Sequence, residues 1–321
     1  MRHLFILNPV AGGGKRTEAV RTEIIETMQA QEDPWELYET QGIQDATRMV
    51  HKAAEGTEPL RVYACGGDGT LNECVNGLVG KPHAAVTHFP AGTGNDFIKV
   101  FHTGREAFFK LPNLLDPQEM AIDVIEAGGR YGINICSVGL DARIAADVHR
   151  YSGLPGVQGK GAYFLSLLAN VGKGIARPFE VEAAGKTYRQ KFTLICACNG
   201  RSYGGAFTPV PEAMPDDGLM DILLVDQTSR AGALGLVKKY AAGKYKEIPK
   251  LITHLQSDSM TIRADREFMV NLDGEILRKR EVHFKLLPAA VRFFAPKQAS
   301  FHGLSASIEG EAEETEENQS N

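Results

Sequence analysis

The first third of the chain alternates short apolar runs with segments of helical periodicity, and this alternation limits the folds that are open to it. The apolar runs lie at 3–7, 35–40, 60–65 and 84–89, and the helical segments at 15–29, 45–55, 70–79 and from residue 94 onward. Strands and helices that alternate through short loops form a parallel sheet covered by helices, with right-handed crossovers. The sequence therefore predicts an α/β domain.

From about residue 120 the pattern changes to apolar runs that follow one another through Gly or Asp turns. Such a pattern is typical of antiparallel β-structure. A helical insertion interrupts it, first at 140–152 and again at 161–175. We expect an α/β domain at 1–125, completed by a returning segment at 289–300, and a β domain at 126–288.

Charge and composition restrict the class of protein. The net charge is −5, but six glutamates lie in the acidic tail at 304–321, so the rest of the chain carries about +1. The tail has the composition of a disordered segment, and the near-neutral body gives no reason to expect a nucleic-acid partner. The five cysteines show no CxxC spacing, which predicts reduced thiols in a cytoplasmic protein. No run approaches the roughly 18 apolar residues that span a bilayer.

Three of the predicted parallel strands end in glycine-bearing loops, "NPVAGGGKRT" (8–17), "GGDGT" (66–70) and "PAGTGND" (90–96). Helix N-termini meet the carboxyl ends of parallel strands, and their free N–H groups suit phosphate. A Walker A loop is excluded because Arg16 follows Gly14-Lys15 and Pro9 occupies the outer glycine position. The dinucleotide fingerprint fails in all three loops. One such loop alone would be read as a turn, but three together predict a polyphosphate site.

The three loops together resemble the diacylglycerol kinase catalytic domain, which soluble bacterial lipid kinases share. The similarity in order and spacing covers roughly residues 1 to 300. Loops like GGDGT also occur in NAD kinases, whereas the downstream string "PAGTGNDF" (90–97) is more specific. The resemblance implies a three-layer α/β nucleotide-binding domain followed by a β-sandwich domain, with MgATP and a lipid alcohol in the cleft between them.

The resemblance also implies which residues contact the nucleotide. They lie in or beside the glycine loops and at the end of the second strand. They are Asn8, Pro9, Gly12, Thr40, Gly66, Gly67, Asp68, Gly69, Thr70, Asn72, Glu73 and Thr93.

Two acids of the first domain have two readings each. Asp68 begins a predicted helix close to the expected phosphates, where it could bind Mg²⁺ or cap the helix. Asp96 also begins a predicted helix, and the resemblance places it with Asp68 in a magnesium network, in which both acids are metal ligands. Asp123 is a lone acid on an apolar strand, which could join that network or point outward.

The string "VNLDGEIL" places Asp273, Gly274 and Glu275 between two predicted strands. Asp-Gly in this position is a strong hairpin signal, and a tight turn can also project carboxylates across a cleft. In related lipid kinases this position carries the catalytic acid, so the resemblance implies Asp273 as the general base and Glu275 as its alternative. The base would receive the alcohol proton late, as the new P–O bond forms.

Two further loops are candidates. Asp216-Asp217-Gly218 reads as a turn, and the resemblance implies a structural magnesium there, bound by Asp217 and the carbonyls of Met214 and Leu219. The Gly-rich stretch after the strand that ends near 198 is expected to line the lipid site, with Gly204 and Gly205 shaping it.

These observations predict an ATP- and Mg²⁺-dependent lipid kinase, with diacylglycerol as the expected acceptor and phosphatidic acid as the product. The alternatives are a kinase of NAD or another small molecule in the same superfamily, and a nucleotide-binding module without catalysis. A lipid acceptor implies a cytoplasmic protein that contacts the inner face of the membrane transiently, and the resemblance makes a homodimer an expectation too.

Overall fold

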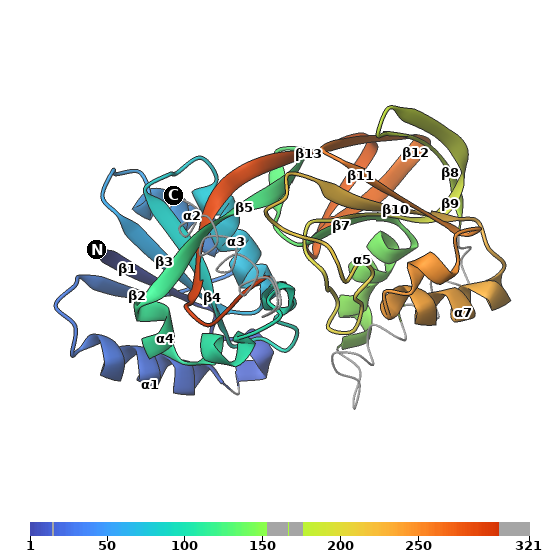
Figure 1. Cartoon of the computed structure of the whole chain (residues 1–321). Helices are drawn as coiled ribbons and strands as arrows, with labels where there is room; N and C mark the ends of the chain where they lie inside the picture. Colours follow the sequence, from blue (N-terminus) through green and yellow to red (C-terminus); the bar gives the residue numbers. More distant parts are fainter. Residues whose placement is uncertain (15, 153–165, 167–175, 302–321) are drawn as a thin grey trace, which may run out of the picture.

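The chain forms two lobes that are joined by long strands (Figure 1). The structure is a computed structural model that describes residues 1–14, 16–152, 166 and 176–301. The second half of the helical insertion and the acidic tail therefore lie outside the described residues, except for Ser166. Among the described residues, no helix is both long and apolar enough to cross a membrane.

The first lobe is the predicted α/β domain. Its strands are β1 (Arg2–Leu7), β2 (Trp35–Glu39), β3 (Leu60–Gly66) and β4 (Ala84–Pro90), and its helices are α1 (Thr17–Met28), α2 (Asp45–Ala53), α3 (Asp68–Leu78) and α4 (Leu111–Leu115). The strands are parallel in the order β2-β1-β3-β4. Every residue of β4 is buried, as expected for a parallel strand that is covered on both faces.

The prediction of a helix that begins at residue 94 is wrong. The segment forms a single 3₁₀ turn, η2 (Phe97–Val100). Its residues do not alternate between a buried and an exposed face: Phe97, Ile98 and Val100 are all buried, and Phe97 packs edge-on against Phe293. A tight turn can bury consecutive side chains in this way, whereas a surface helix needs a polar face. Two further short 3₁₀ turns, η1 (Ala11–Gly14) and η3 (Arg105–Phe109), belong to the same lobe.

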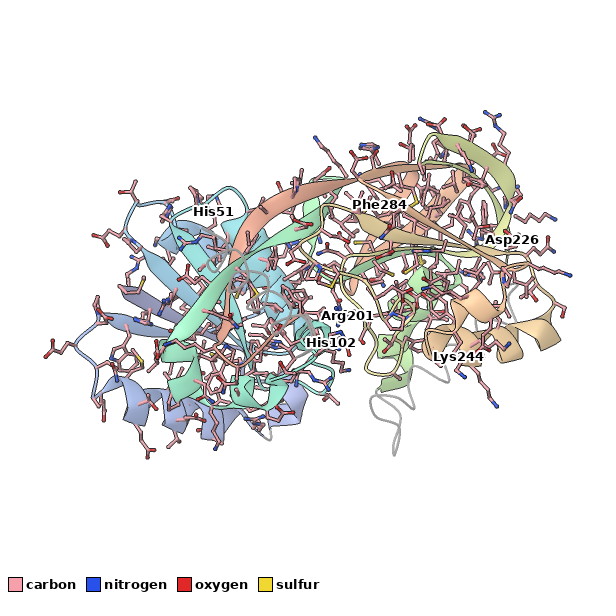
Figure 2. The ribbon with its side chains drawn as sticks, viewed as in Figure 1. His51, His102, Arg201, Asp226, Lys244 and Phe284 are labelled. Atoms are coloured by element: carbon pink, nitrogen blue, oxygen red, sulfur yellow. The ribbon has the colours of Figure 1, made fainter. Side chains whose placement is uncertain are left out.

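The second lobe is the predicted antiparallel β domain. Its strands are β5 (Pro117–Ala127), β6 (Arg130–Gly132), β7 (Ile135–Gly139), β8 (Arg177–Ala183), β9 (Lys186–Cys198), β10 (Met220–Asp226), β11 (Ile252–Ser257), β12 (Ser259–Leu272) and β13 (Glu275–Pro296), and its helical elements are α5 (Leu140–Ser152), α7 (Arg230–Ala241) and η4 (Tyr245–Glu247). Both β9 and β12 pair with β7 at one end and with β8 at the other. The sheet thus folds over on itself around a core that includes Val181, Ile195 and Phe284, which is the expected β-sandwich. Figure 2 labels Phe284.

Strand β13 connects the two lobes. It begins against β12, continues beside β5, and ends parallel to β4 in the first lobe. Its register shifts between Leu287 and Val291, where Ala289 has a positive φ of 49°. Beyond this bend Val291, Phe293 and Phe294 join the core of the first lobe. One continuous strand therefore fixes how the two lobes face each other.

Buried polar residues strengthen the junction between the lobes. Asp123 of β5 is 3% exposed, and its carboxylate accepts hydrogen bonds from the N–H groups of Ala289 (2.7 Å) and Gly218 (2.8 Å). Neither reading of Asp123 from the sequence describes this role, because the side chain points inward and ties the bend of β13 to a loop. Arg201 contacts His102 across the junction, with 2.5 Å between Nη1 and Nε2 (Figure 2).

Candidate active site

The three glycine loops lie together at the carboxyl ends of the parallel strands. The N–H groups of Ala91 and Gly92 donate to the carbonyl oxygen of Gly66 at 2.8 and 3.0 Å. A Cβ atom on Gly12 would lie 2.6 Å from the carbonyl oxygen of Ala91, and one on Gly92 would lie 2.4 Å from the Cα of Gly67. The loops therefore pack backbone against backbone, at a separation that only glycine allows.

The first-lobe residues that the sequence assigns to the nucleotide surround these loops. Asn8 donates from Nδ2 to the hydroxyl of Thr70 (3.2 Å), and the carbonyl of Pro9 accepts from Thr17. Thr40 lies at the end of β2, where its N–H donates to Leu7 (2.9 Å). The structure thus brings Asn8 and Thr70 into contact, and whether these residues contact a nucleotide stays a prediction.

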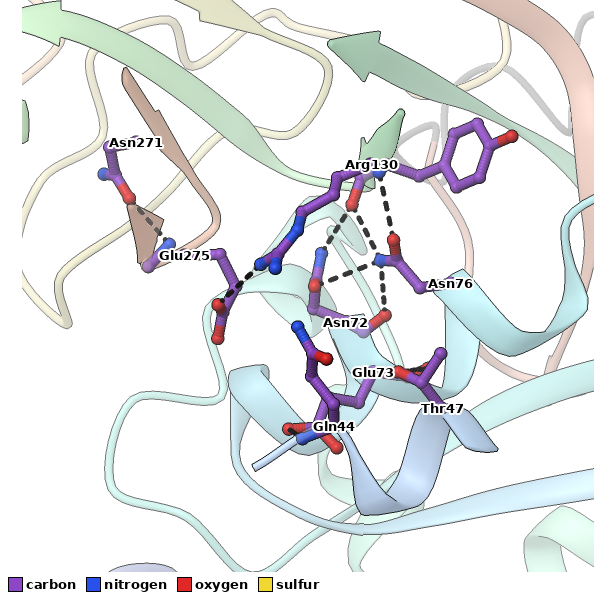
Figure 3. A network of polar contacts seen from close by, with 10 residues as sticks. Gln44, Thr47, Asn72, Glu73, Asn76, Arg130, Asn271 and Glu275 are labelled. Atoms are coloured by element: carbon purple, nitrogen blue, oxygen red, sulfur yellow. Dashed lines mark hydrogen bonds and ion pairs between the residues drawn. The ribbon is translucent and has the colours of Figure 1, made fainter. Parts of the chain in front are cut away.

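Glu73 and Asn72, neighbours on α3, face different partners (Figure 3). The carboxylate of Glu73 accepts the N–H groups of Gln44 (2.9 Å) and Ala46 (3.1 Å) at the start of α2, which is a capping arrangement. Asn72 donates from Nδ2 to the carboxylate of Asp273 in the second lobe, at 3.1 Å. The sequence assigns both residues to nucleotide binding, and the structure gives each a partner within the protein.

Asp68 does not cap its own helix. Its Oδ1 accepts the N–H groups of Asp96 (2.5 Å) and Phe97 (3.2 Å), so it holds the third glycine loop against the second. Burial raises the pKa of Asp68, and the nearby His88 opposes that rise. Asp96 is 5% exposed, forms an ion pair with Lys99, and accepts the N–H of Gly205 from the second lobe at 2.8 Å.

Gly94 lies beside the carboxylates of both acids. A Cβ atom at Gly94 would lie 2.8 Å from Oδ2 of Asp68 and 3.3 Å from Oδ2 of Asp96, so an oxygen of each carboxylate lies close to this glycine. Mg²⁺ is commonly held by one or two carboxylates with water and substrate phosphates, and this pair fits such a site. No group of three or more His, Cys, Asp or Glu side chains suited to a metal occurs among the described residues.

Asp273 lies in the tight turn between β12 and β13 with a positive φ of 50°. Its carboxylate accepts the N–H groups of Ile133 (2.6 Å), Asn134 (3.1 Å) and Ile135 (2.7 Å), in addition to the amide of Asn72. Burial raises its pKa to about 6, against the opposing effect of these donors. A carboxylate with this pKa is largely ionised at neutral pH and still basic enough to accept a proton.

Glu275 has a different environment. Its carboxylate forms an ion pair with Arg130 (3.1 Å; Figure 3), and the side chain is 39% exposed. Glu275 does not line the main cavity, whereas Asp273 does. The geometry therefore favours Asp273 over Glu275 as the base, an assignment that stays a prediction.

A cavity of about 540 Å³ lies between the lobes and collects these groups. Asp68, Thr93 and Asp96 line it from the first lobe, and Asp141 and Asp273 line it from the second. The loop residues Tyr203, Gly204 and Gly205 also line it, where the sequence places the acceptor site.

Asp141 is the residue that the sequence interpretation missed. It is 4% exposed and accepts hydrogen bonds from Ser137 Oγ (2.6 Å) and the Tyr203 hydroxyl (3.1 Å). Ser137 in turn accepts from Asn271 (3.4 Å), two residues before Asp273. The only sequence feature that could have pointed to Asp141 is an acid between a buried strand and a helix. An acid in that position is equally typical of an ordinary helix N-terminus.

The predicted structural magnesium loop is held by other contacts. Asp217 accepts the N–H of Leu219 (3.0 Å), and the sulfur of Met214 accepts from Arg201 (2.9 Å). Partial burial raises the pKa of Asp217, and Asp221 and Asp123 add to that rise. A cation would relieve this crowding of acids, and its presence stays a prediction.

Comparison with known proteins decides the family. The model of the family described as "Diacylglycerol kinase catalytic domain" matches residues 2–127. That of the "YegS C-terminal NAD kinase beta sandwich-like domain" matches residues 134–295. The chain belongs to the diacylglycerol kinase family of YegS type. The first match ends at the last residue of β5 and the second begins one residue before β7. Membership in this kinase family implies the use of ATP.

Relatives agree with this family. The chain is 25% identical over 232 residues to a protein of Staphylococcus aureus strain JH9 named "Putative lipid kinase". The matched stretch covers 72% of this chain and 75% of that protein. A protein of strain MRSA252 with the same description matches with the same identity and coverage. A crystal structure titled as a "putative diacylglycerol kinase" from Bacillus anthracis strain Sterne has a TM-score of 0.72 at 24% identity, and covers 91% of this chain and 94% of that chain. That likeness confirms the fold.

The contact between Gly67 and Gly92 gives a prediction for the kinase fold. Gly92→Ala would drive a methyl group into the backbone of Gly67, which forces the two loops apart. We expect ATP affinity to fall at least about tenfold and stability to fall by about 1–3 kcal/mol, measured by calorimetric titration and thermal unfolding. Gly42→Ala is the matched control, because no atom lies within 4 Å of its Cβ position and Gly42 lies outside the glycine loops. Wild-type ATP binding in Gly92→Ala would contradict the packing argument.

Proposed function

We propose that the protein transfers the γ-phosphoryl group of ATP to the hydroxyl of a membrane lipid, with diacylglycerol as acceptor and phosphatidic acid as product. The observation that carries the proposal is the placement of Asp273 in one cavity with Asp68 and Asp96. In this proposal the two first-lobe acids hold a cation beside the phosphates, and the second-lobe acid accepts the proton.

Each group of the chain has one part in this reaction. Bound MgATP supplies the phosphoryl group and neutralises its charge. The N–H groups of the glycine loops bind phosphate oxygens, and Asp68 and Asp96 would hold Mg²⁺ directly or through water. Asp273 orients the acceptor hydroxyl and receives its proton as the oxygen–phosphorus bond forms and the bond to the ADP oxygen breaks.

A second, small cavity supports a lipid acceptor over a soluble one. It shares Asp141 and Tyr203 with the main cavity, and its other walls are mostly apolar. Leu140, Leu194 and Leu236 are among them. An apolar wall directly beside the polar cleft suits a molecule with a hydroxyl at one end and a hydrocarbon chain at the other, which describes diacylglycerol better than NAD. Such an acceptor would bring a cytoplasmic enzyme to the inner face of the membrane.

Labelled ATP tests the proposal. The purified protein is incubated with γ-labelled ATP and Mg²⁺, in parallel with diacylglycerol in mixed micelles, with other lipid alcohols and with NAD. We expect label in the diacylglycerol product. Label in NAD alone would show the NAD kinase alternative, and ATP binding without transfer to any acceptor would show a nucleotide-binding module.

The pKa of Asp273 predicts the acid side of the pH profile. Because the base must be ionised, kcat/KM should rise about tenfold per pH unit below pH 6 and level off above it. The hydrogen bond from Asn72 lowers this pKa, so Asn72→Ala should move the rising limb to higher pH. Asn76→Ala is the control, since Asn76 contacts Asn72 and Tyr131 and not Asp273. An unmoved limb in Asn72→Ala would assign the ionisation to another group.

A further inference from the structure

Asp141 lies at the border of two cavities. It lines the main cavity between the lobes, and it also lines the small apolar cavity, as Tyr203 does. The proposed phosphoryl transfer gives this buried acid no part, although burying a carboxylate costs free energy that must be offset. Ligand cavities are mostly apolar, with a few placed polar groups that decide which ligand fits. Asp141 is such a group on the side of the acceptor.

Two hydroxyls fix the orientation of the Asp141 carboxylate. Ser137 of β7 donates to Oδ2 at 2.6 Å, and Tyr203, in the loop after β9, donates to Oδ1 at 3.1 Å. Each oxygen of a carboxylate can accept more than one hydrogen bond, and neither oxygen donates one. Asp141 therefore offers the cavity a fixed acceptor group, which attracts a hydrogen-bond donor and repels another acceptor.

Asp141 is joined to the turn that carries Asp273. Asn271 donates to the hydroxyl of Ser137 (3.4 Å), and its Oδ1 accepts the N–H of Gly274 (2.8 Å) in that turn. Asp141 and Asp273 both line the main cavity from the second lobe. An acceptor whose reacting hydroxyl meets Asp273 and whose hydrocarbon enters the apolar cavity therefore places the rest of its headgroup beside Asp141.

We propose that Asp141 accepts a hydrogen bond from a second hydroxyl of the acceptor, so that the enzyme prefers a lipid whose polar end is a diol. The inference rests on the proposed function, because it needs a lipid acceptor with its reacting hydroxyl at Asp273, and it narrows the class of that lipid. Diacylglycerol has one hydroxyl and two ester groups, so it presents only ester oxygens to Asp141 and is the weaker acceptor. A site built to bind a hydroxyl discriminates strongly against an analogue that lacks it.

Two lipids that differ by one hydroxyl test the proposal. One is glycerol esterified with oleate at a terminal carbon, which leaves a diol. The other is its deoxy analogue, which keeps the oleate ester and the terminal hydroxyl but has no hydroxyl on the middle carbon. Their binding to the full chain is measured by calorimetric titration in mixed micelles without ATP. Wild type should bind the diol at least about tenfold more tightly, because a hydrogen bond to a charged group contributes that much or more.

Asp141→Asn tests the assignment to this residue. The amide has nearly the same size, and the hydroxyls of Ser137 and Tyr203 can turn to accept from its nitrogen. We expect the preference for the diol to fall to about threefold or less, because a neutral hydrogen bond contributes less than one to a charged group. Asp147→Asn is the matched control and should keep the full preference, since Asp147 lies on the same helix and lines neither cavity. A purely structural role of Asp141 would weaken the binding of both lipids alike and leave the preference unchanged.

Equal binding of the two lipids by wild type, an unchanged preference in Asp141→Asn, or the same loss in Asp147→Asn would overturn the proposal. Because the titration contains no ATP, its result does not depend on transfer. Transfer to diacylglycerol without a preference for the diol would leave the proposed function standing and remove this inference. A diol preference without transfer to any lipid would remove the proposed function and leave Asp141 as a residue that recognises diols. Binding of neither lipid would contradict both.

Discussion

Asp273→Asn is expected to lower kcat by about 10²- to 10⁴-fold, the usual contribution of general base catalysis. The amide is nearly the same size as the carboxylate, but Ile133 donates to Oδ2 and Ile135 to Oδ1, so the single amide oxygen can accept only one of these two N–H groups. It cannot accept the acceptor proton at any pH near neutrality. The loss should therefore appear in single-turnover transfer to diacylglycerol, and the rising limb of the pH profile should disappear with it.

Two controls separate this loss from a structural one. ATP affinity of Asp273→Asn should stay near that of wild type, because the glycine loops belong to the first lobe. Glu275→Gln should retain most of the activity, since Glu275 pairs with Arg130 and does not line the cavity. Near-normal turnover in Asp273→Asn, or a comparable loss in Glu275→Gln, would show that the base is assigned to the wrong residue.

The architecture was predictable because it depends on local periodicity. The strand and helix spacing in the first third led to the α/β domain, and the runs after residue 120 led to the β-sandwich. The exception, the 3₁₀ turn at Phe97–Val100, has a tertiary cause, because all its apolar side chains enter the core at once. The spacing of apolar residues reveals helices and strands that bury one face. It does not reveal a turn that buries all of its apolar side chains.

The candidate site was predictable only where a residue type in a given position has few structural roles. Glycines at three strand ends pointed to the converging loops, and Asp-Gly between strands pointed to the turn at Asp273. The partners were not predictable, because hydrogen bonds such as those of Asp123 with Gly218 and Ala289 join residues far apart in the chain. Asp141 shows the same limit: its neighbours Ser137 and Tyr203 meet it only once the sandwich has folded.

Asp68→Asn should lower kcat about a thousandfold through the loss of one negative charge. The amide oxygen can still accept the N–H groups of Asp96 and Phe97, so the third glycine loop should keep its place. The amide nitrogen would then occupy the position of Oδ2, beside Gly94 and on the side of Asp96. A donor there repels a cation, and cation binding is worth several kcal/mol at the transition state, with about 1.4 kcal/mol for each factor of ten.

The decisive measurement is the dependence of ATP affinity on Mg²⁺. Wild type should bind ATP more tightly as Mg²⁺ is added, and Asp68→Asn should lose that increment while its affinity for ATP alone stays the same or rises, because a charge that repels phosphate has gone. Asp68→Ala removes the loop contacts as well, so it should also weaken metal-free binding and lower the unfolding temperature. If Asp68→Asn keeps the full Mg²⁺ increment, the carboxylate serves only to hold the loop, and the cation must be bound by Asp96 and the phosphates without it.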